Sequence, residues 1–130
     1  MPADHRREGY STVSPYLIAD DPAAILRFLE ATCDARVIDR TDDGERIRHL
    51  ALAIGDDGVI MVGGAAEEWP ATSTLVHIYV PDCDAAYASA LEAGATAIMP
   101  PSAQDYGDRA AGVRGPQGNT WWFATAAAAG

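Results

Sequence analysis

The hydrophobic positions of this chain switch between a period of two, typical of strands, and a period near 3.6, typical of helices. Apolar runs at 13–19 and 75–80 are each followed by aspartates and then by a segment with helical spacing. The residues expected on the apolar helix faces are Ile25, Phe28 and Leu29 in the first segment, and Tyr87, Ala90 and Leu91 in the second. The pattern therefore predicts a strand followed by a helix, twice.

Residues at the ends of both helical segments support these boundaries. Asp20, Asp21 and Asp82 stand where a side chain can accept hydrogen bonds from the free N–H groups of the first helical turn. Pro22 suits the first helical position, because its φ is fixed and it has no amide hydrogen. Gly94 is expected to end the second helix in a left-handed conformation.

Further strands are predicted after each helix. At 48–54, Leu50, Leu52 and Ile54 share one face, while His49, Ala51 and Ala53 share the other. Glycine-bounded turns then lead to closing strands at 59–62 and 121–125. Each half of the chain is thus predicted to contain a strand, a helix and two or three antiparallel strands.

The two halves are also similar in sequence, which indicates a tandem duplication. When residues 18–35 are aligned with 80–97, Asp20 matches Asp82, and the Leu-Glu-Ala at 29–31 matches the same triplet at 91–93. We expect an α+β fold in which two modules form one curved mixed sheet, with a central cup and the helices outside. The predicted divisions are an N-terminal tail (1–10), a first module (11–66), a connector (67–74), a second module (75–125) and an Ala-rich tail (126–130).

Composition and charge narrow the function. The chain has 130 residues, with 9 Lys and Arg against 19 Asp and Glu, and a formal net charge of −10. This balance disfavours nucleic-acid binding, which requires a surplus of basic side chains. No apolar run is long enough to span a membrane, and the first ten residues lack the apolar core of a secretory signal. Two cysteines do not make a disulfide framework. We expect a cytoplasmic protein.

Four stretches carry a resemblance to a known family: SPYLIADDPAAILRFL, RHLALAIGDDGVIMV, VHIYVPDCDAAYASALEAGA and YGDRAAGVRGPQGNTWWFAT. They resemble the vicinal oxygen chelate superfamily of glyoxalases, extradiol dioxygenases and bleomycin-resistance proteins. The last stretch is the most specific, although Gly115 stands where an Asp is usual. The resemblance implies two βαβββ modules, a ligand in the cup and a homodimer.

Enzymes of that superfamily generally hold a divalent metal in the cup through His, Gln or Glu side chains. Counting from the Asp after each first strand and from the glycine turns places the corresponding positions at Val13, at Ile60 or Val62, at Leu75 and at Trp122. None of these side chains can coordinate a metal. We therefore expect no metal and no cofactor.

Other side chains are expected to line the cup. If Val76, Ile78 and Val80 lie under the helices, then His77 and Tyr79 point into the cup, and His49 does so by the same parity. The expected ligand-binding residues are His77, Tyr79, Trp122, His49, Arg109, Tyr106 and Trp69, the last two from loops. For several of these a structural role is an alternative: Arg109 can pair with Asp105 or Asp108, and Trp69 can be a lid, a dimer contact or an exposed side chain.

These residues favour a metal-free binding protein that sequesters a hydrophobic or aromatic compound, including cationic, antibiotic-like molecules. One alternative is a metal-independent lyase or isomerase with His77 or His49 as the acid or base. A second is a metal-dependent glyoxalase or dioxygenase with displaced ligands.

Overall fold

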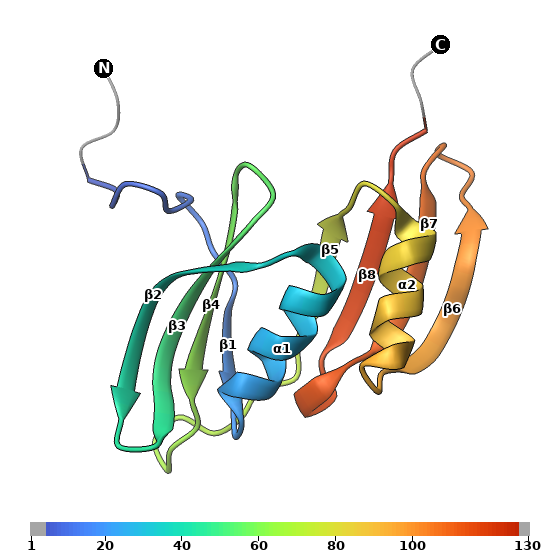
Figure 1. Ribbon diagram of the computed structural model, residues 1–130. Coiled ribbons are helices and arrows are strands. Elements are labelled where there is room, and N and C mark those ends of the chain that lie inside the picture. Colours follow the sequence, from blue (N-terminus) through green and yellow to red (C-terminus); the bar gives the residue numbers. More distant parts are fainter. Residues whose placement is uncertain (1–4, 128–130) are drawn as a thin grey trace.

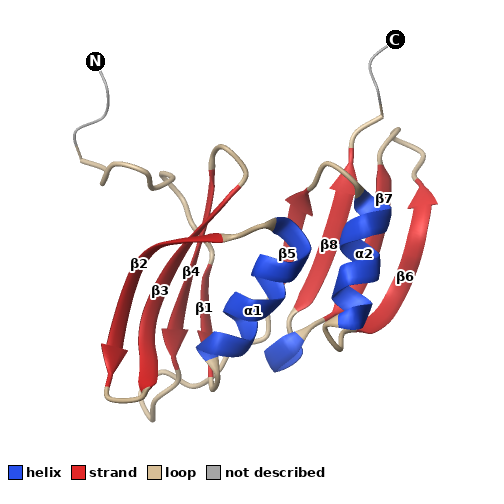
Figure 2. Cartoon of the chain, viewed as in Figure 1, coloured by secondary structure: helices blue, strands red, loops and turns tan. Residues whose placement is uncertain are grey.

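Each half of the chain folds as a strand, a helix and three further strands (Figure 1 and Figure 2). The computed structural model describes residues 5–127. The elements are β1 (Tyr16–Ala19), α1 (Pro22–Cys33), β2 (Arg36–Asp43), β3 (Arg46–Ile54), β4 (Gly58–Gly64), β5 (Leu75–Tyr79), α2 (Cys83–Glu92), β6 (Thr96–Ala103), β7 (Arg109–Arg114), the short η1 (Pro116–Gly118) and β8 (Thr120–Thr125).

The strands form two four-stranded mixed sheets with the same topology. Their orders are β1-β4-β3-β2 and β5-β8-β7-β6. The first strand of each module is parallel to the last, and the other neighbours are antiparallel. The α+β class and the tandem of βαβββ modules are confirmed; the difference is that the strands form two sheets instead of one.

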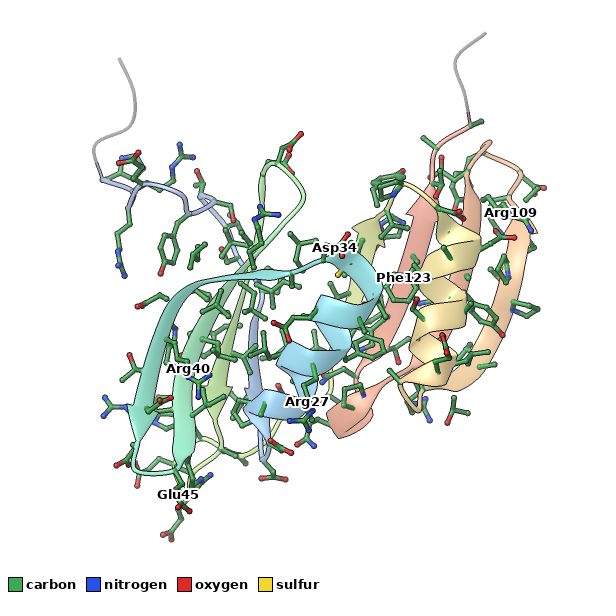
Figure 3. The ribbon with its side chains drawn as sticks, viewed as in Figure 1. Arg27, Asp34, Arg40, Glu45, Arg109 and Phe123 are labelled. Atoms are coloured by element: carbon green, nitrogen blue, oxygen red, sulfur yellow. The ribbon has the colours of Figure 1, made fainter. Side chains whose placement is uncertain are left out.

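One hydrophobic core joins the two modules. Both helices lie on the same side of the sheets and contact each other (Figure 1). Phe28 of α1 packs against two residues of β8, with ring-centroid distances of 5.5 Å to Trp121 and 6.4 Å to Phe123. Figure 3 shows Phe123 between α1 and its own sheet. The first helix is therefore held by the second sheet as well as by its own.

The predicted strand faces agree with the core, except at the start of the first strand. Leu50, Leu52, Val76 and Ile78 are buried as expected. Val13 is not part of β1, which begins at Tyr16, and its side chain is 82% exposed. The apolar run at 13–19 therefore begins before the strand does, because its first residues lie outside the core.

Two details of the helices differ from the sequence prediction. Leu91 is exposed, and α2 instead buries Cys83, Ala86 and Ala90. Asp82 caps α2 by accepting the Ala85 N–H at 3.1 Å. At α1 the Asp21 side chain makes no cap; its backbone N–H donates to the side-chain oxygen of Gln117 at 3.1 Å.

Three strands follow the helix in each module, where the sequence predicted two or three. The additional strands, β2 and β6, are the outer edges of their sheets and are mostly exposed. An edge strand with both faces near solvent carries little alternation, which explains why the pattern did not locate them. The predicted tails at 1–10 and 126–130 lie partly outside the described residues, and no helix within 5–127 has the length and hydropathy to cross a membrane.

Replacing Phe28 tests the joint between the modules. We expect Phe28→Ala to lower the free energy of unfolding by about 3–5 kcal/mol, because it leaves a cavity against Trp121 and Phe123. Urea denaturation followed by circular dichroism measures the change. The control is Leu91→Ala on the exposed side of α2, expected to cost less than about 1 kcal/mol. Equal effects of the two substitutions would contradict a core shared through Phe28.

Candidate ligand-binding site

The second sheet has one face covered by the helices and one face open to solvent. Along β5, Val76 and Ile78 are buried, whereas Leu75, His77 and Tyr79 are exposed, with 62% of Tyr79 accessible. Strand register extends this alternation across β8 and β7. We define the open face by its residues: Leu75, His77, Tyr79, Ala110, Gly112, Arg114, Thr120, Trp122 and Ala124.

The rings of three residues, His77, Tyr79 and Trp122, lie on adjacent strands of this open face. His77 is in register with Trp122, which is in register with Gly112. The indole lies over that glycine so closely that a Cβ at 112 would be 2.5–2.7 Å from its ring. The His77 and Tyr79 rings meet edge to face with centroids 5.0 Å apart. The structure thus brings His77, Tyr79 and Trp122 together on one surface.

Tyr79 also reaches a carboxylate that the sequence analysis treated only as a partner for Arg109. Its phenol O–H donates to Oδ2 of Asp108 at 2.7 Å. The register runs from Tyr79 to Ala124 to Ala110, so the ring crosses β8 to reach Asp108, and Ala124 beneath it is fully buried. This hydrogen bond, followed by the charge of Asp108, raises the pKa of Tyr79 and keeps the phenol protonated.

Tyr106, predicted as a loop residue of the site, is highly exposed beside this pair. It lies near enough to Tyr79 to contribute to the raised pKa of that phenol. The side chain of Gln104 in the same loop is instead hydrogen-bonded to Ser102. Tyr106 therefore lies near Tyr79.

Arg109 faces the helices, not the open face. Its guanidinium makes two hydrogen bonds to Asp84 of α2, at 2.6 and 3.0 Å (Figure 3). The bond lowers the pKa of the Asp84 carboxyl. The predicted pairing with Asp105 or Asp108 was wrong, because strand alternation sends Arg109 and Asp108 to opposite faces. The same alternation was the signal in the sequence that could have identified Asp108.

A cavity of about 300 Å³ borders the open face along the free edge of β5. His77 and Tyr79 line it from one side, and the β3–β4 turn lines it from the other. Its apolar wall includes Val13, Pro15, Val59 and Ile60. Both modules therefore contribute to this cavity.

His49 lies in the first module, on β3, and Trp69 lies in the connector between β4 and β5. Nδ1 of His49 is 4.0 Å from Oδ2 of Asp39, and its ring centroid is 5.8 Å from that of Tyr16. Trp69 is exposed next to a separate cavity of about 250 Å³ near the β2–β3 turn. Within residues 5–127, no hydrogen bond, ion pair or ring contact links either side chain to His77, Tyr79 or Trp122.

Backbone register shows which residues of the first module are equivalent to Leu75 and Trp122, two positions at which the resemblance implies metal ligands. The Met61 N–H donates to Pro15 O, and the Thr120 N–H donates to Thr74 O, so these pairs are equivalent. Tyr16 then corresponds to Leu75 and Gly63 to Trp122, which corrects the predicted Val13 and the predicted Ile60 or Val62. The Tyr16 ring lies where a Cβ on Gly63 would stand, 2.9 Å from its nearest atom.

These four positions do not fit a divalent metal. They offer one phenol oxygen and no imidazole or carboxylate. Over residues 5–127 no three His, Cys, Asp or Glu side chains are grouped to hold an ion.

The two thiols are also unsuited to chemistry. Cys33 donates to Leu29 O at 3.3 Å, and Cys83 to Phe123 O at 3.5 Å. Burial raises the pKa of Cys33 to about 11. The nucleophilic thiolate of Cys33 is therefore scarce at neutral pH.

Comparisons with known proteins agree with this fold. The family model described as the Glyoxalase/Bleomycin resistance protein/Dioxygenase superfamily matches residues 11–123. The chain belongs to this superfamily. An uncharacterized protein of Mycobacterium tuberculosis (strain ATCC 25618 / H37Rv) is 32% identical over 120 residues, covering 84% of this chain and 71% of that protein.

Two solved structures are similar in three dimensions. TioX from Micromonospora sp. ML1 has a TM-score of 0.75 and 26% identity, over 88% of this chain and 98% of TioX. The fosfomycin resistance protein FosX from Mesorhizobium loti has a TM-score of 0.62 and 15% identity, over 88% of this chain and 91% of FosX, and shares the fold alone.

Replacing Gly112 tests the arrangement of Trp122. Gly112→Ala places a methyl group in the space of the indole, so we expect a loss of about 1–3 kcal/mol in unfolding free energy and an altered near-ultraviolet circular dichroism spectrum. In a Trp122→Ala background the same substitution should cost less than about 1 kcal/mol, because the clash is gone. An equal cost in both backgrounds would show that the indole does not cover Gly112.

Proposed function

We propose that this protein binds a hydrophobic or aromatic small molecule on the open face of the second sheet, without a metal, and acts by sequestering it. The observation that carries the proposal is the contiguous, solvent-accessible set of rings from His77, Tyr79 and Trp122 beside a cavity of about 300 Å³. Isolated soluble chains rarely leave so many aromatic side chains together in water without a function.

The chemistry of this surface matches that of a small-molecule site. Such sites combine mainly apolar and aromatic walls with a few polar groups. Here the walls are aromatic rings and the apolar lining of the cavity, and the polar groups are the His77 imidazole and the linked Tyr79 and Asp108. A planar ligand can stack on the indole of Trp122, whose other face lies against the backbone of Gly112.

The superfamily and one of the similar structures favour an antibiotic as the compound bound. The superfamily includes bleomycin resistance proteins, and FosX is a fosfomycin resistance protein. Because FosX shares only the fold with this chain, its own ligand does not carry over. We therefore propose sequestration of an antibiotic-like compound, which the ligand titration below identifies.

A metal-independent enzyme is the second candidate, with His77 or His49 as the acid or base. His77 contacts Tyr79 only through its ring, and no carboxylate within residues 5–127 forms an ion pair with it. A general base is normally oriented by a hydrogen-bonded partner. His49 does face Asp39, but at 4.0 Å and in the other module. These distances favour binding over catalysis.

We also propose a homodimer. Large apolar and aromatic side chains are exposed on the open faces of both modules, including Tyr16, Leu75 and Tyr79. A second copy that covers part of these faces would remove them from water and enclose the ligand.

Ligand titration tests the binding function. Trp69→Phe removes a highly exposed tryptophan that would mask the signal of Trp122. In this background, at least one compound in a panel of aromatic antibiotics is expected to quench the fluorescence saturably with a 1:1 stoichiometry per chain. His77→Gln should weaken that binding about tenfold in the same titration. Trp122→Ala removes the fluorescent reporter, so its binding is measured by calorimetry, where we also expect a loss of about tenfold through lost ring contacts.

Three outcomes would change the proposal. A panel without saturable binding would overturn it. Turnover of a bound compound that His77→Gln abolishes with binding intact would favour the enzyme. Stoichiometric metal in elemental analysis of the purified protein would favour the metal-dependent alternative.

Light scattering coupled to size exclusion tests the dimer. We expect about twice the 13.7 kDa chain mass at micromolar concentration. Leu75→Glu, on the open face, should shift the protein toward the monomer, because it would bury a charge at the interface. Leu91→Glu on the helix side is the control and should leave the mass unchanged. A wild-type monomer at this concentration would remove the dimer proposal.

A further inference from the structure

The open face of the second sheet ends at a carboxylate with an unusual environment. Asp108 directly precedes β7 and is only 8% exposed. Its partner among residues 5–127 is the phenol of Tyr79, which donates to Oδ2. In the described part of the chain, the fully buried polar side-chain atoms without a partner belong to Tyr10 and Trp121. The second oxygen of Asp108 is not among them and therefore keeps contact with solvent.

A largely buried carboxylate is normally compensated by a positive charge. The ion pairs within residues 5–127 use Asp39, Asp42 and Asp84, and none of them includes Asp108. Arg109, the adjacent residue, is directed to the opposite face and held by Asp84 at 2.6 Å. Arg114 is on the open face, but at the far end of β7. Within residues 5–127 the carboxylate therefore has a hydrogen-bond donor and no cationic partner.

The surroundings of Asp108 are aromatic. Tyr79 crosses the sheet to reach it, Tyr106 is nearby, and His77 meets the Tyr79 ring edge to face. Aromatic faces attract cations through their quadrupoles, and a carboxylate beside them adds a directed charge. An organic cation, with an apolar body and a positive nitrogen, fits both features. A simple anion does not, because this end of the face presents a negative charge.

We propose that Asp108 is the anchor for a positively charged group of the ligand, with Tyr79 as the positioning residue that orients its carboxylate, so that the protein selects aromatic cations over neutral and anionic aromatics. This inference rests on the proposed function and deepens it. The charged group of the ligand contacts Asp108, while its rings lie along Tyr79, His77 and Trp122. The overall charge of −10 acts in the same direction, but only Asp108 supplies a directed contact.

Three planar compounds of equal ring size test the selectivity by calorimetry at slightly alkaline pH. They are 10-methylacridinium, a permanent cation; acridine, which is neutral; and acridine-9-carboxylate, an anion. We expect the affinity for the cation to be at least about tenfold higher than that for acridine, and the anion to have the lowest affinity. Raising the salt concentration should lower the affinity for the cation and leave the affinity for acridine unchanged.

Variants separate the role of Asp108 from general charge. Asp108→Asn is expected to lower the affinity for the cation about tenfold and to change the affinity for acridine by less than about twofold. Asp105→Asn removes the same charge from an exposed position of the same loop and should change the cation affinity less than about threefold. Tyr79→Phe keeps the ring and removes the hydrogen-bond donor, so it should lower the affinity for the cation and not that for acridine. Added to Asp108→Asn, it should lower the cation affinity little further.

Each outcome decides between the two proposals. If none of the three compounds binds, the aromatic binding function itself fails, and the inference fails with it. If all three bind equally, or if Asp108→Asn and Asp105→Asn have the same effect, the binding surface stands and the anchor is overturned. If Asp108→Asn instead dissociates a dimer in light scattering, the carboxylate serves a second copy of the chain, which also overturns the anchor.

Discussion

The packing of Phe28 against Trp121 and Phe123 is the interaction on which the rest of this structure depends. It brings a helix of the first module onto the last strand of the second, so that two small sheets share one core. A βαβββ unit of this size buries little apolar surface alone. Once the helices and this core occupy one side of both sheets, the other side remains available for a ligand or a second chain.

Small residues beneath large rings shape that available side. Gly112 lies under Trp122, Gly63 under Tyr16, and Ala124 under Tyr79. In each case the absence of a larger side chain lets a ring lie along the sheet. Gly63 and Trp122 are among the positions at which the resemblance implies metal ligands. The rings of Tyr16 and Trp122 lie at these positions, which is consistent with recognition by stacking.

Charge is divided between the two faces by a single step along the chain. Asp108 and Arg109 are neighbours, and strand alternation sends the carboxylate to the open face and the guanidinium to α2. The Arg109–Asp84 pair then ties β7 to its helix, while Asp108 is left with the Tyr79 phenol. A structural ion pair and a candidate recognition group thus arise from adjacent residues with opposite roles.

The amino-acid sequence was enough to predict the fold class, the duplication, both helices and the two faces of the central strands, because these follow from local periodicity and end signals. It also determined that His77, Tyr79 and Trp122 share a face, since period-two alternation is a local property. The tertiary structure decided what alternation does not carry. The exposed edge strands β2 and β6 are specified by pairing with their neighbours, and Leu91 is exposed because α2 rests on its alanines. The partner of Arg109 on α2, the phenol on Asp108 and the separation of His49 and Trp69 from the aromatic surface depend on contacts between residues far apart in sequence, which only the packed chain brings together.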